Sequence, residues 1–498
     1  MRLSTAQSDR AAGVLLAMAA GDALGAGYEF GPPLSTETPV VMAGGGSFGW
    51  AAGEWTDDTS MAVAIAEAAA EGADLLAPAA QDRIAARWAA WAAEGNYVGI
   101  QTRSVLGSAV RAARDRGDQR PTALDLRRAA TALHECTGRT AGNGSLMRTA
   151  PVALAYLNDP DGLVTAAGEL SALTHADPEA AEACALWCLA IRHAVVVGTF
   201  DGVHDELGRL GAERAQVWAE RLREAEAHEP AHFERNGWVV HALQGAWSAI
   251  TRTLASERAP AGAFPASHLR HALEAAVRGG RDTDTVAAIA GALLGARWGA
   301  SAVPASWRRL LHGWPGLRAR DLVRLGVLTA RGGQPDAQGW PSGPTLDYST
   351  WPHRSVVVRS PHDEQVWLSG VGSLAALPEG VDAVVSLCRL GVDDLPAAAV
   401  KARDHVEVWL VDDERPDRNP HLDYVLTEAA EAIRQLRAEG RTVLLHCVQA
   451  QSRTPTVAAL YGAQVTGRSP RDCLADIQRV LPTAHPNPAM LAALDRLT

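Results

Sequence analysis

The residue pattern of this 498-residue chain changes at residues 331–352, and that change limits its possible folds more than any single motif. Residues 8–330 are a succession of Ala- and Leu-rich segments of helical length, such as DRAAGVLLAMAA, with almost no alternating β-branched runs. After the change, short β-branched runs such as DAVVSLC and TVLLHC alternate with helical segments. The chain is also too long for a single core. We therefore predict a multi-domain protein, with an all-α domain over 8–330 and an α/β domain over 353–498.

The stretch between the two patterns has the composition of a linker. Its sequence, RGGQPDAQGWPSGPTLDYSTWP, is rich in Gly, Pro and Ser and shows neither the helical nor the strand period. Segments of this kind are typically exposed connections between domains. The sequence thus predicts a linker over residues 331–352.

Composition and charge exclude several functions. The formal net charge of −11 removes the usual electrostatic reason for binding nucleic acid. We expect no apolar run of the roughly 18 residues that span a membrane, and the first residues do not resemble a secretion signal, so we expect a cytoplasmic protein without a membrane partner. The six cysteines form no C-x-x-C pair, which argues against a disulfide framework or a zinc site. The one lysine lies in no Walker-type phosphate loop.

Two acidic clusters precede apolar helical runs in the first domain. They are Thr56-Asp57-Asp58-Thr59 and Arg281-Asp282-Thr283-Asp284-Thr285. Helix capping explains one such cluster, because Asp and Thr are favoured at helix starts. Two clusters, each with two carboxylates that repel each other, are better explained by a shared cation. Ligands that are all oxygen favour Mg²⁺ or Mn²⁺, and two ions about 3.5 to 4 Å apart could activate a water for hydrolysis.

Five motifs, taken in order, give the first domain its resemblance to a known family. They are GDALGAGYEF (21–30), WTDDTSM (55–61), GNGSLMRTAPVAL (142–154), THADPEA (174–180) and GGRDTDTVAAIAGALLGARWG (279–299). Their order and spacing resemble the ADP-ribosylglycohydrolase family, which includes dinitrogenase reductase-activating glycohydrolase. The resemblance implies an all-α helical domain with two Mg²⁺ or Mn²⁺ ions. It also implies hydrolysis of an N- or O-glycosidic bond of ADP-ribose on a protein or a small molecule.

The resemblance also implies roles for individual residues. The metal ligands would be Thr56, Asp57, Asp58, Asp282, Asp284 and Thr285. Glu29 would face the substrate ribose, the backbone of Asn143, Gly144 and Ser145 would approach the diphosphate, and His175 would lie at the rim of the pocket. The chain departs from many relatives at Tyr97, where they carry Asp before Val-Gly, so the linkage cleaved is less well specified than the metal site.

The second domain carries the motif HCVQAQSRT between a predicted strand and a predicted helix. Backbone N–H groups of residues 448–453 can surround a phosphate there, and the start of the helix adds favourable potential and favours the thiolate of Cys447. The planar guanidinium of Arg453 can bind two phosphate oxygens. Over about residues 353–498 the sequence resembles the dual-specificity branch of the cysteine phosphatases, which need no cofactor. The implied roles are Cys447 as nucleophile, Asp412 or alternatively Asp413 as general acid, and Thr454 in breakdown of the phosphocysteine.

One residue of this loop leaves two functions open. The glycine usual in the family is Ala450 here, and a Cβ is unfavourable wherever φ is positive. The main interpretation is a bifunctional hydrolase that acts on ADP-ribosylated and on phosphorylated substrates. The alternative is a glycohydrolase regulated by a phosphate-binding sensor without turnover. A third interpretation, a non-enzymatic helical domain, is disfavoured because both acidic clusters are present.

Overall fold

A computed structural model describes residues 3–95, 97–254, 264–397 and 400–497, and the chain forms two compact units. The first comprises residues 1–263, 268–303 and 310–334, and the second comprises residues 264–267, 304–309 and 335–498.

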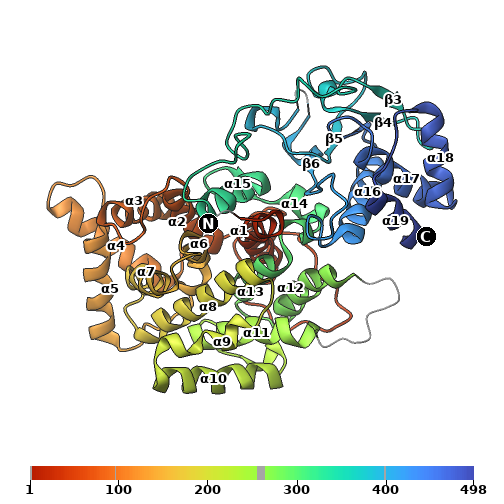
Figure 1. Ribbon diagram of the computed structural model, residues 1–498. Coiled ribbons are helices and arrows are strands. Elements are labelled where there is room, and N and C mark those ends of the chain that lie inside the picture. The colour runs from red at the N-terminus through yellow and green to blue at the C-terminus, as the bar shows by residue number, and fades with distance from the viewer. Residues whose placement is uncertain (1–2, 96, 255–263, 398–399, 498) are drawn as a thin grey trace. The chain divides into compact units, whose positions relative to one another are not determined.

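The first unit is built almost entirely of helices (Figure 1), as the Ala- and Leu-rich pattern predicts. A short antiparallel pair, β1 (His312–Gly313) with β2 (Leu317–Arg318), is the exception among the described residues. The helices are α1 (Thr5–Gly25), α2 (Asp57–Ala70), α3 (Pro78–Glu94), α4 (Ile100–Asp115), α5 (Ala123–Thr137), α6 (Ala150–Ala155), α7 (Pro160–Ala172), α8 (Pro178–Val197), α9 (Gly202–Asp205), α10 (Ala212–Ala227), α11 (Val239–Leu254), α12 (His268–Arg278), α13 (Thr283–Trp298) and α15 (Ala319–Ala330).

Helices α1 and α13 form the centre of this unit and pack with their backbones in close contact (Figure 1). Glycines make that approach possible: a Cβ on Gly21 would lie 2.1 Å from the carbonyl oxygen of Ala287, and one on Gly25 would lie 2.5 Å from the Cα of Asp284. Glycine is the residue that permits such contact between backbones. The packing brings the end of α1 beside the start of α13, where the second acidic cluster lies.

Two helices of the first unit are long and apolar enough to cross a membrane by length and composition. They are the segments Thr5–Tyr28 and Pro178–Val197, so the expectation that no run reaches spanning length was wrong. In the structure, 89% and 67% of their apolar windows are buried against the rest of the unit. The central helices of a large core are also hydrophobic on all sides, so they pass the same test.

The second unit is an α/β structure around a five-stranded sheet of order β3-β4-β7-β5-β6. Strand β3 runs antiparallel to β4 at one edge, and the other neighbours are parallel. The strands are β3 (Val357–Arg359), β4 (Val366–Ser369), β5 (Ala383–Ser386), β6 (His405–Glu407) and β7 (Val443–His446). The helices are α14 (Ala305–Leu310, of which 305–309 belong to this unit), α16 (Leu422–Ala438), α17 (Arg453–Thr466), α18 (Pro470–Val480) and α19 (Pro488–Arg496). The central strand β7 therefore delivers Cys447 to the carboxyl edge of the sheet, where such folds bind ligands.

Residues 335–352, which have the composition of a linker, pack on the second unit. Asp336 and Arg389 form an ion pair with a distance of 2.9 Å. The Arg389 guanidinium lies 4.2 Å from the ring centroid of Trp340, and the hydroxyl of Tyr348 donates to the carbonyl oxygen of Arg389. The Gly- and Pro-rich segment is therefore ordered, although it forms neither helix nor strand. The division between the compact units falls between residues 334 and 335.

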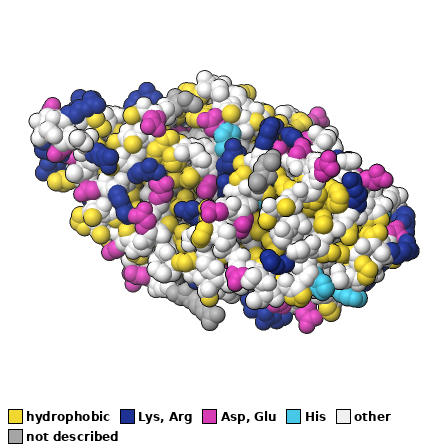
Figure 2. All heavy atoms as spheres, turned by 90° about the horizontal axis from the view of Figure 1, so that it is seen from above, with side chains coloured by type: hydrophobic (Ala, Val, Ile, Leu, Met, Phe, Trp, Pro, Cys, Tyr) yellow, Lys and Arg dark blue, Asp and Glu magenta, His cyan; other side chains and the backbone are white. Residues whose placement is uncertain are grey.

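Basic and acidic side chains are interspersed on the surface that Figure 2 draws, with hydrophobic side chains scattered between them. The whole sequence has 57 acidic and 46 basic residues. The mixture gives no extended field of one sign on that face.

Candidate functional sites

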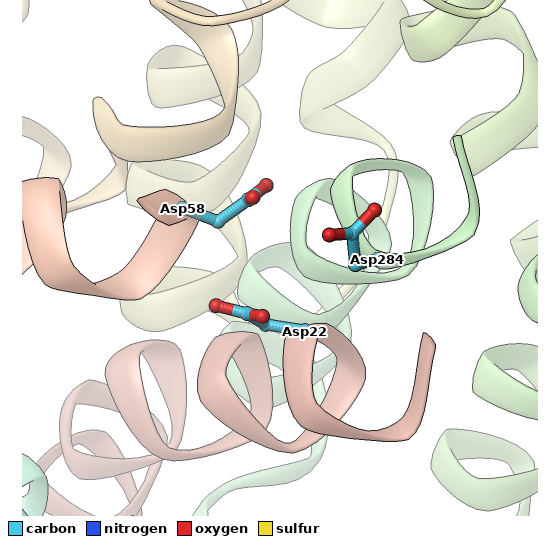
Figure 3. Close-up of side chains that lie close together, drawn as sticks. All are labelled: Asp22, Asp58 and Asp284. Atoms are coloured by element: carbon cyan, nitrogen blue, oxygen red, sulfur yellow. The ribbon is translucent and has the colours of Figure 1, made fainter. Parts of the chain in front are cut away.

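Carboxylates from three helices meet in the first unit. Asp22 lies on α1, Asp58 in the first turn of α2 and Asp284 in the first turn of α13, and Figure 3 shows the three side chains pointing toward one another. One oxygen of each lies within 4.8 Å of the others. A second group with the same spacing comprises Glu29, Asp282 and Asp284. Because Asp284 belongs to both groups, the cluster could hold two adjacent cations that share one carboxylate.

The two predicted clusters do not serve as helix caps. Thr56 is the N-cap of α2 and Asp282 is the N-cap of α13, yet neither side chain makes a capping hydrogen bond. Instead the hydroxyl of Thr56 lies 3.1 Å from Asp58 Oδ2 and 3.4 Å from Asp284 Oδ2. The hydroxyl of Thr285 lies 3.5 Å from the same oxygen of Asp58. In a helix cap, these side chains would point toward the backbone of the first turn. Here they point toward the carboxylates instead, which contradicts the simple capping explanation.

Burial and the crowding of carboxylates disfavour the charged forms of the acidic side chains in the cluster. Burial raises the pKa of Asp57 to about 7 and that of Glu29 to about 8, and the neighbouring carboxylates add to both shifts. The pKa values of Asp58 and Asp284 are raised well above the usual range for the same reasons. Asp58 Oδ1 and Glu29 Oε2 are buried without a hydrogen-bond partner among the described residues. Since buried polar groups are normally satisfied, these oxygens fit hard divalent cations well.

Asp57 lies at the edge of the cluster. It belongs to neither group of converging oxygens, and its Oδ2 is 3.4 Å from the backbone nitrogen of Gly99. Its carboxylate is nevertheless buried, with 6% of its surface exposed. The structure therefore brings Thr56, Asp58, Asp284 and Thr285 into direct contact, with Asp57 beside them.

Asp22 is a site residue that the sequence analysis missed. Its Oδ1 accepts a hydrogen bond from the backbone of Thr56, and its Oδ2 accepts from the backbone and the hydroxyl of Thr59. These three bonds hold the first turn of α2 in place, so most of the acceptor capacity of this carboxylate is already used. Burial raises its pKa to about 6, against the effect of the hydrogen bonds. A single carboxylate inside the apolar run LLAMAAGDALG was the signal that could have identified it.

Asn143 orients one of the carboxylates. Its amide nitrogen donates to Asp282 Oδ2 at 2.7 Å and to the carbonyl oxygen of Asn236 at 2.8 Å. Its backbone N–H donates to the carbonyl oxygen of Gly237. This residue therefore supports Asp282, which differs from the backbone contact with a diphosphate that we expected. Ser145 is fully buried, and its hydroxyl accepts hydrogen bonds from Ser171 and Cys184.

His175 lies beneath the glycine turn rather than at the rim of a pocket. Its side chain is buried, and its Nε2 lies 3.3 Å and 3.2 Å from where a Cβ of Gly142 or Gly144 would be. A Cβ at either position would crowd the imidazole, and glycine avoids that contact. The expected rim position was wrong, because THADPEA enters the core at the end of α7 before α8 begins at Pro178.

A buried arginine is linked to His175 through a hydroxyl. Arg148, which stacks 4.0 Å over the ring of Trp88, donates to the hydroxyl of Thr174 at 2.7 Å. That hydroxyl lies 2.7 Å from His175 Nδ1. Burial, followed by the charge of Arg148, lowers the pKa of His175 well below its usual value, so the ring is neutral.

The second unit presents the predicted cysteine loop between β7 and α17. Cys447 directly follows β7 and is 1% exposed, and α17 begins at Arg453. Arg453 Nη1 donates to the carbonyl oxygens of Leu387 and Leu410, at 2.6 Å and 3.2 Å. Its Nε is buried and makes an ion pair with Asp412 Oδ2 at 3.5 Å, beyond the geometry of a hydrogen bond. One side of the guanidinium is therefore anchored on the backbone, and the other faces Asp412.

The structure separates the two candidate acids of this loop system. Asp412 Oδ1 accepts from the amide of Asn487 at 3.0 Å, and its Oδ2 lies 3.5 Å from Arg453 Nε. Asp413 instead binds Arg415, with Arg418 3.8 Å away, and hydrogen bonds with Arg415 lower its pKa strongly. Asp412 thus lies beside Arg453 of the loop, whereas Asp413 is turned toward Arg415 and Arg418, so position favours Asp412 as the candidate general acid. Asn487 is a supporting residue that the sequence did not reveal.

The loop contains the backbone strain that the sequence predicted. Ala450 is fully buried and has a φ of 55°. A residue with a Cβ therefore adopts the left-handed conformation that glycine prefers. The hydroxyl of Thr454 is buried without a hydrogen-bond partner among the described residues. A buried polar group without a protein partner is normally hydrogen-bonded to a ligand or a water.

Comparisons with known proteins identify the family of the helical unit. The family model described as ADP-ribosylglycohydrolase matches residues 3–335. The ADP-ribosylarginine hydrolase Tri1 of Pseudomonas putida strain GB-1 is 30% identical over 302 residues, which cover 60% of this chain and 73% of that protein. The ADP-ribosyl-(dinitrogen reductase) glycohydrolase of Rhodospirillum rubrum is 28% identical over 321 residues, covering 60% and 89%.

Solved structures are similar to parts of this chain. A chain of an ADP-ribosylglycohydrolase-related protein complex has a TM-score of 0.49 and 28% identity, covering 66% of this chain and 99% of that one. The crystal structure of human DUSP28 has a TM-score of 0.24 and 21% identity, covering 28% and 91%.

Proposed function

Because the chain belongs to the ADP-ribosylglycohydrolase family, we propose that its helical unit hydrolyses the glycosidic bond between ADP-ribose and a protein side chain with two Mg²⁺ or Mn²⁺ ions. The observation that carries the proposal is the pair of carboxylate groups that share Asp284. The named activities of the two relatives, on ADP-ribosylarginine and on ADP-ribosylated dinitrogen reductase, support a protein substrate.

The ligands for the two ions come from the cluster itself. One ion would be held by Asp58 and Asp284 with Thr56 and Thr285 nearby, and the other by Glu29, Asp282 and Asp284. Bound there, such ions supply positive charge that polarises oxygen and promotes deprotonation of a water. Asp22 keeps the first turn of α2 in register, and Asn143 keeps Asp282 turned toward the cluster. These two residues act by positioning ligands.

His175 and the glycine turn suit the diphosphate side of the substrate. Nε2 of the neutral imidazole lies adjacent to Gly142 and Gly144, and in the tautomer with its proton on Nε2 the ring would donate to an oxyanion there. Glycine at these positions lets a ligand approach the backbone. We therefore assign the turn at residues 142–145 to the ADP-ribose moiety.

The decisive experiment incubates the metal-loaded chain with peptides that carry ADP-ribose on arginine, on serine or on glutamate, and identifies products by mass spectrometry. Free ADP-ribose and the unmodified peptide are expected from at least one linkage, and the reaction should stop in excess chelator. Undiminished hydrolysis in chelator would contradict the two-ion proposal. Release of ADP-ribose from none of the linkages would contradict the proposed activity itself.

A second function is proposed for the α/β unit, namely cysteine-dependent hydrolysis of phosphate esters. The supporting observation is the position of Cys447 at the carboxyl end of β7, before an Arg453 whose Nε pairs with Asp412 at 3.5 Å. The Cys447 thiolate would attack phosphorus, and the ester oxygen would leave with a proton from Asp412. Water would then cleave the phosphocysteine, returning a proton to Asp412 and releasing orthophosphate. The strain at Ala450 instead favours the alternative, a sensor that binds phosphate without turnover.

Turnover separates the enzyme from the sensor. An aryl phosphate and an alkyl phosphate are offered to the full chain and to its Cys447→Ser variant, with binding of orthophosphate measured in parallel. Release of phosphate by the parent chain alone supports the enzyme. Binding of orthophosphate with no release from either ester would make the unit a sensor.

A further inference from the structure

A pocket beside the carboxylate cluster has no role in the function proposed above. It has a volume of about 470 Å³ and is lined by Phe48, Tyr97, Val98, Ile100, Arg103 and Ser104. Of these lining residues, Arg103 alone is charged. Pockets that combine apolar walls with one or two polar groups are the usual form of a binding site.

Aromatic side chains form one wall of the pocket. The rings of Phe48 and Tyr97 have centroids 4.2 Å apart at an angle of 34°, and Phe30 meets Phe48 edge to face at 6.1 Å. Ile100 adds an apolar side chain that is 86% exposed. Exposed apolar side chains grouped in this way commonly contact a partner.

Phe30 is held beside the catalytic cluster in an unusual conformation. Its φ is 64°, which is rare for a bulky residue, and its ring is 58% exposed. Its backbone N–H donates to the carbonyl oxygen of Arg281. This hydrogen bond links Phe30, which follows Glu29, to Arg281, which precedes Asp282. Strain of this kind concentrates at binding sites, where the surrounding structure maintains it.

The pocket opens directly next to the carboxylates. The backbone nitrogen of Gly99 lies 3.4 Å from Asp57 Oδ2, two residues beyond Tyr97. Burial raises the pKa of the Tyr97 phenol, and the negative charges of Asp57 and Glu29 raise it further.

The first turn of α4 separates this pocket from the glycine turn assigned to ADP-ribose. Gln101 and Thr102 face that turn, since their side-chain oxygens lie 3.4 Å and 3.5 Å from where a Cβ of Gly142 or Gly144 would be. Ile100, Arg103 and Ser104, on the same helical turn, line the pocket instead. A substrate that places its ADP-ribose at residues 142–145 and its scissile bond at the carboxylates would extend its other side into the pocket.

We propose that this pocket is the subsite for the target protein next to the ADP-ribosylated residue, and that it receives an aromatic side chain flanked by an acidic residue. The aromatic side chain packs on Phe48 and Ile100. The acidic residue pairs with Arg103, which can bind a carboxylate with two parallel hydrogen bonds. The proposal rests on the glycohydrolase function proposed above.

The test compares two peptides with ADP-ribose on the same arginine, one followed by Phe-Glu and one by Gly-Gly. For the metal-loaded full chain we expect an about tenfold lower KM for the Phe-Glu peptide at similar kcat, as one well-packed ring and one ion pair can supply. Phe48→Ala, Ile100→Ala and Arg103→Ala should each remove most of that preference, while leaving the KM of the Gly-Gly peptide within about twofold.

Two control variants and a binding measurement keep the result unambiguous. Arg111→Ala removes an exposed arginine farther along α4, and Val197→Ala removes an exposed side chain at the end of α8; neither should change the preference. If neither peptide is cleaved, the proposed function fails for arginine, and the Kd of each intact peptide, measured by fluorescence anisotropy, replaces KM. Equal KM or Kd values for the two peptides in the parent chain would overturn the subsite whatever the outcome for hydrolysis.

Discussion

The two candidate sites of this chain are built in opposite ways. The carboxylate cluster draws on segments around residues 22, 57 and 284, and it concentrates buried negative charge. The cysteine loop lies within residues 446–454, and it presents backbone N–H groups, a helix start and an arginine. The difference in charge predicts opposite ligands, cations in the first site and oxyanions in the second. The difference in assembly predicts that the first site depends on helix packing and the second on local loop geometry.

The sharpest way to break this comparison is to remove one site and measure the other. Asp284→Asn removes the carboxylate that both cation positions share, so glycohydrolase activity should fall by a factor on the order of 10³ or more. Phosphate ester hydrolysis should be unchanged, as measured with an aryl phosphate. The matched control is Cys447→Ser, which should show the reverse pattern. Loss of both activities in either variant would mean that the sites are coupled.

A second comparison lies within the cysteine loop system, between neighbouring carboxylates. Asp412→Asn should lower kcat for an alkyl phosphate by about 10², since the general acid is lost, and should affect an aryl phosphate less. Asp413→Asn should change kcat by no more than a few fold, because this carboxylate is already tied to Arg415. Steady-state rates for both esters test the assignment. A larger loss in Asp413→Asn would exchange the two roles.

The charge of the carboxylate cluster predicts how stability depends on pH without metal. The folded pKa values are raised to about 6 for Asp22, about 7 for Asp57 and about 8 for Glu29, all above those of an unfolded chain. Their stabilising effect is therefore complete below pH about 4 and is lost as pH rises through about 6 to 8. Chelated protein should accordingly show a falling midpoint of thermal unfolding over that range.

Added metal should reverse this trend. Mn²⁺ at about 100 times its Kd should raise the free energy of unfolding of the helical unit by about 2.7 kcal/mol at pH 8, as linkage requires. Calorimetry of the full chain with and without chelator measures the effect. The transition that responds to Cys447→Ser should be insensitive to metal. A flat pH profile in chelator, or no response to Mn²⁺ or Mg²⁺, would contradict the cation site.

The smallest effect is expected at Ala450, where the cysteine loop is strained. Ala450→Gly removes a Cβ from a left-handed conformation that costs roughly 1 to 2 kcal/mol, offset in part by the greater freedom of glycine when unfolded. We expect a net gain of about 0.5 to 1 kcal/mol in the free energy of unfolding, measured by urea titration. Ala459→Gly, in the interior of α17, should destabilise instead. A loss of stability in Ala450→Gly would show that the φ of 55° is not a source of strain.

Local sequence determined much of this architecture. The strand, loop and helix around Cys447 are contiguous, so the period of the hydrophobic residues and the motif HCVQAQSRT located that site directly. The acidic clusters at Thr56–Asp58 and Asp282–Thr285 were recognisable because each directly precedes a long apolar run. The all-α and α/β patterns of the two units likewise follow from periods of 3.6 and 2 residues along the chain.

Tertiary structure alone decided which distant residues serve these motifs. Close packing of α1 on α13, possible only with glycine at positions 21 and 25, brings Asp22 to the cluster. The buried Arg148 donates to Thr174, whose hydroxyl contacts His175, and Asn487 donates to Asp412. Each of these contacts joins residues whose separation or side-chain direction no local period encodes. Their chemistry depends on burial and hydrogen bonding, which exist only once the helices and strands have packed.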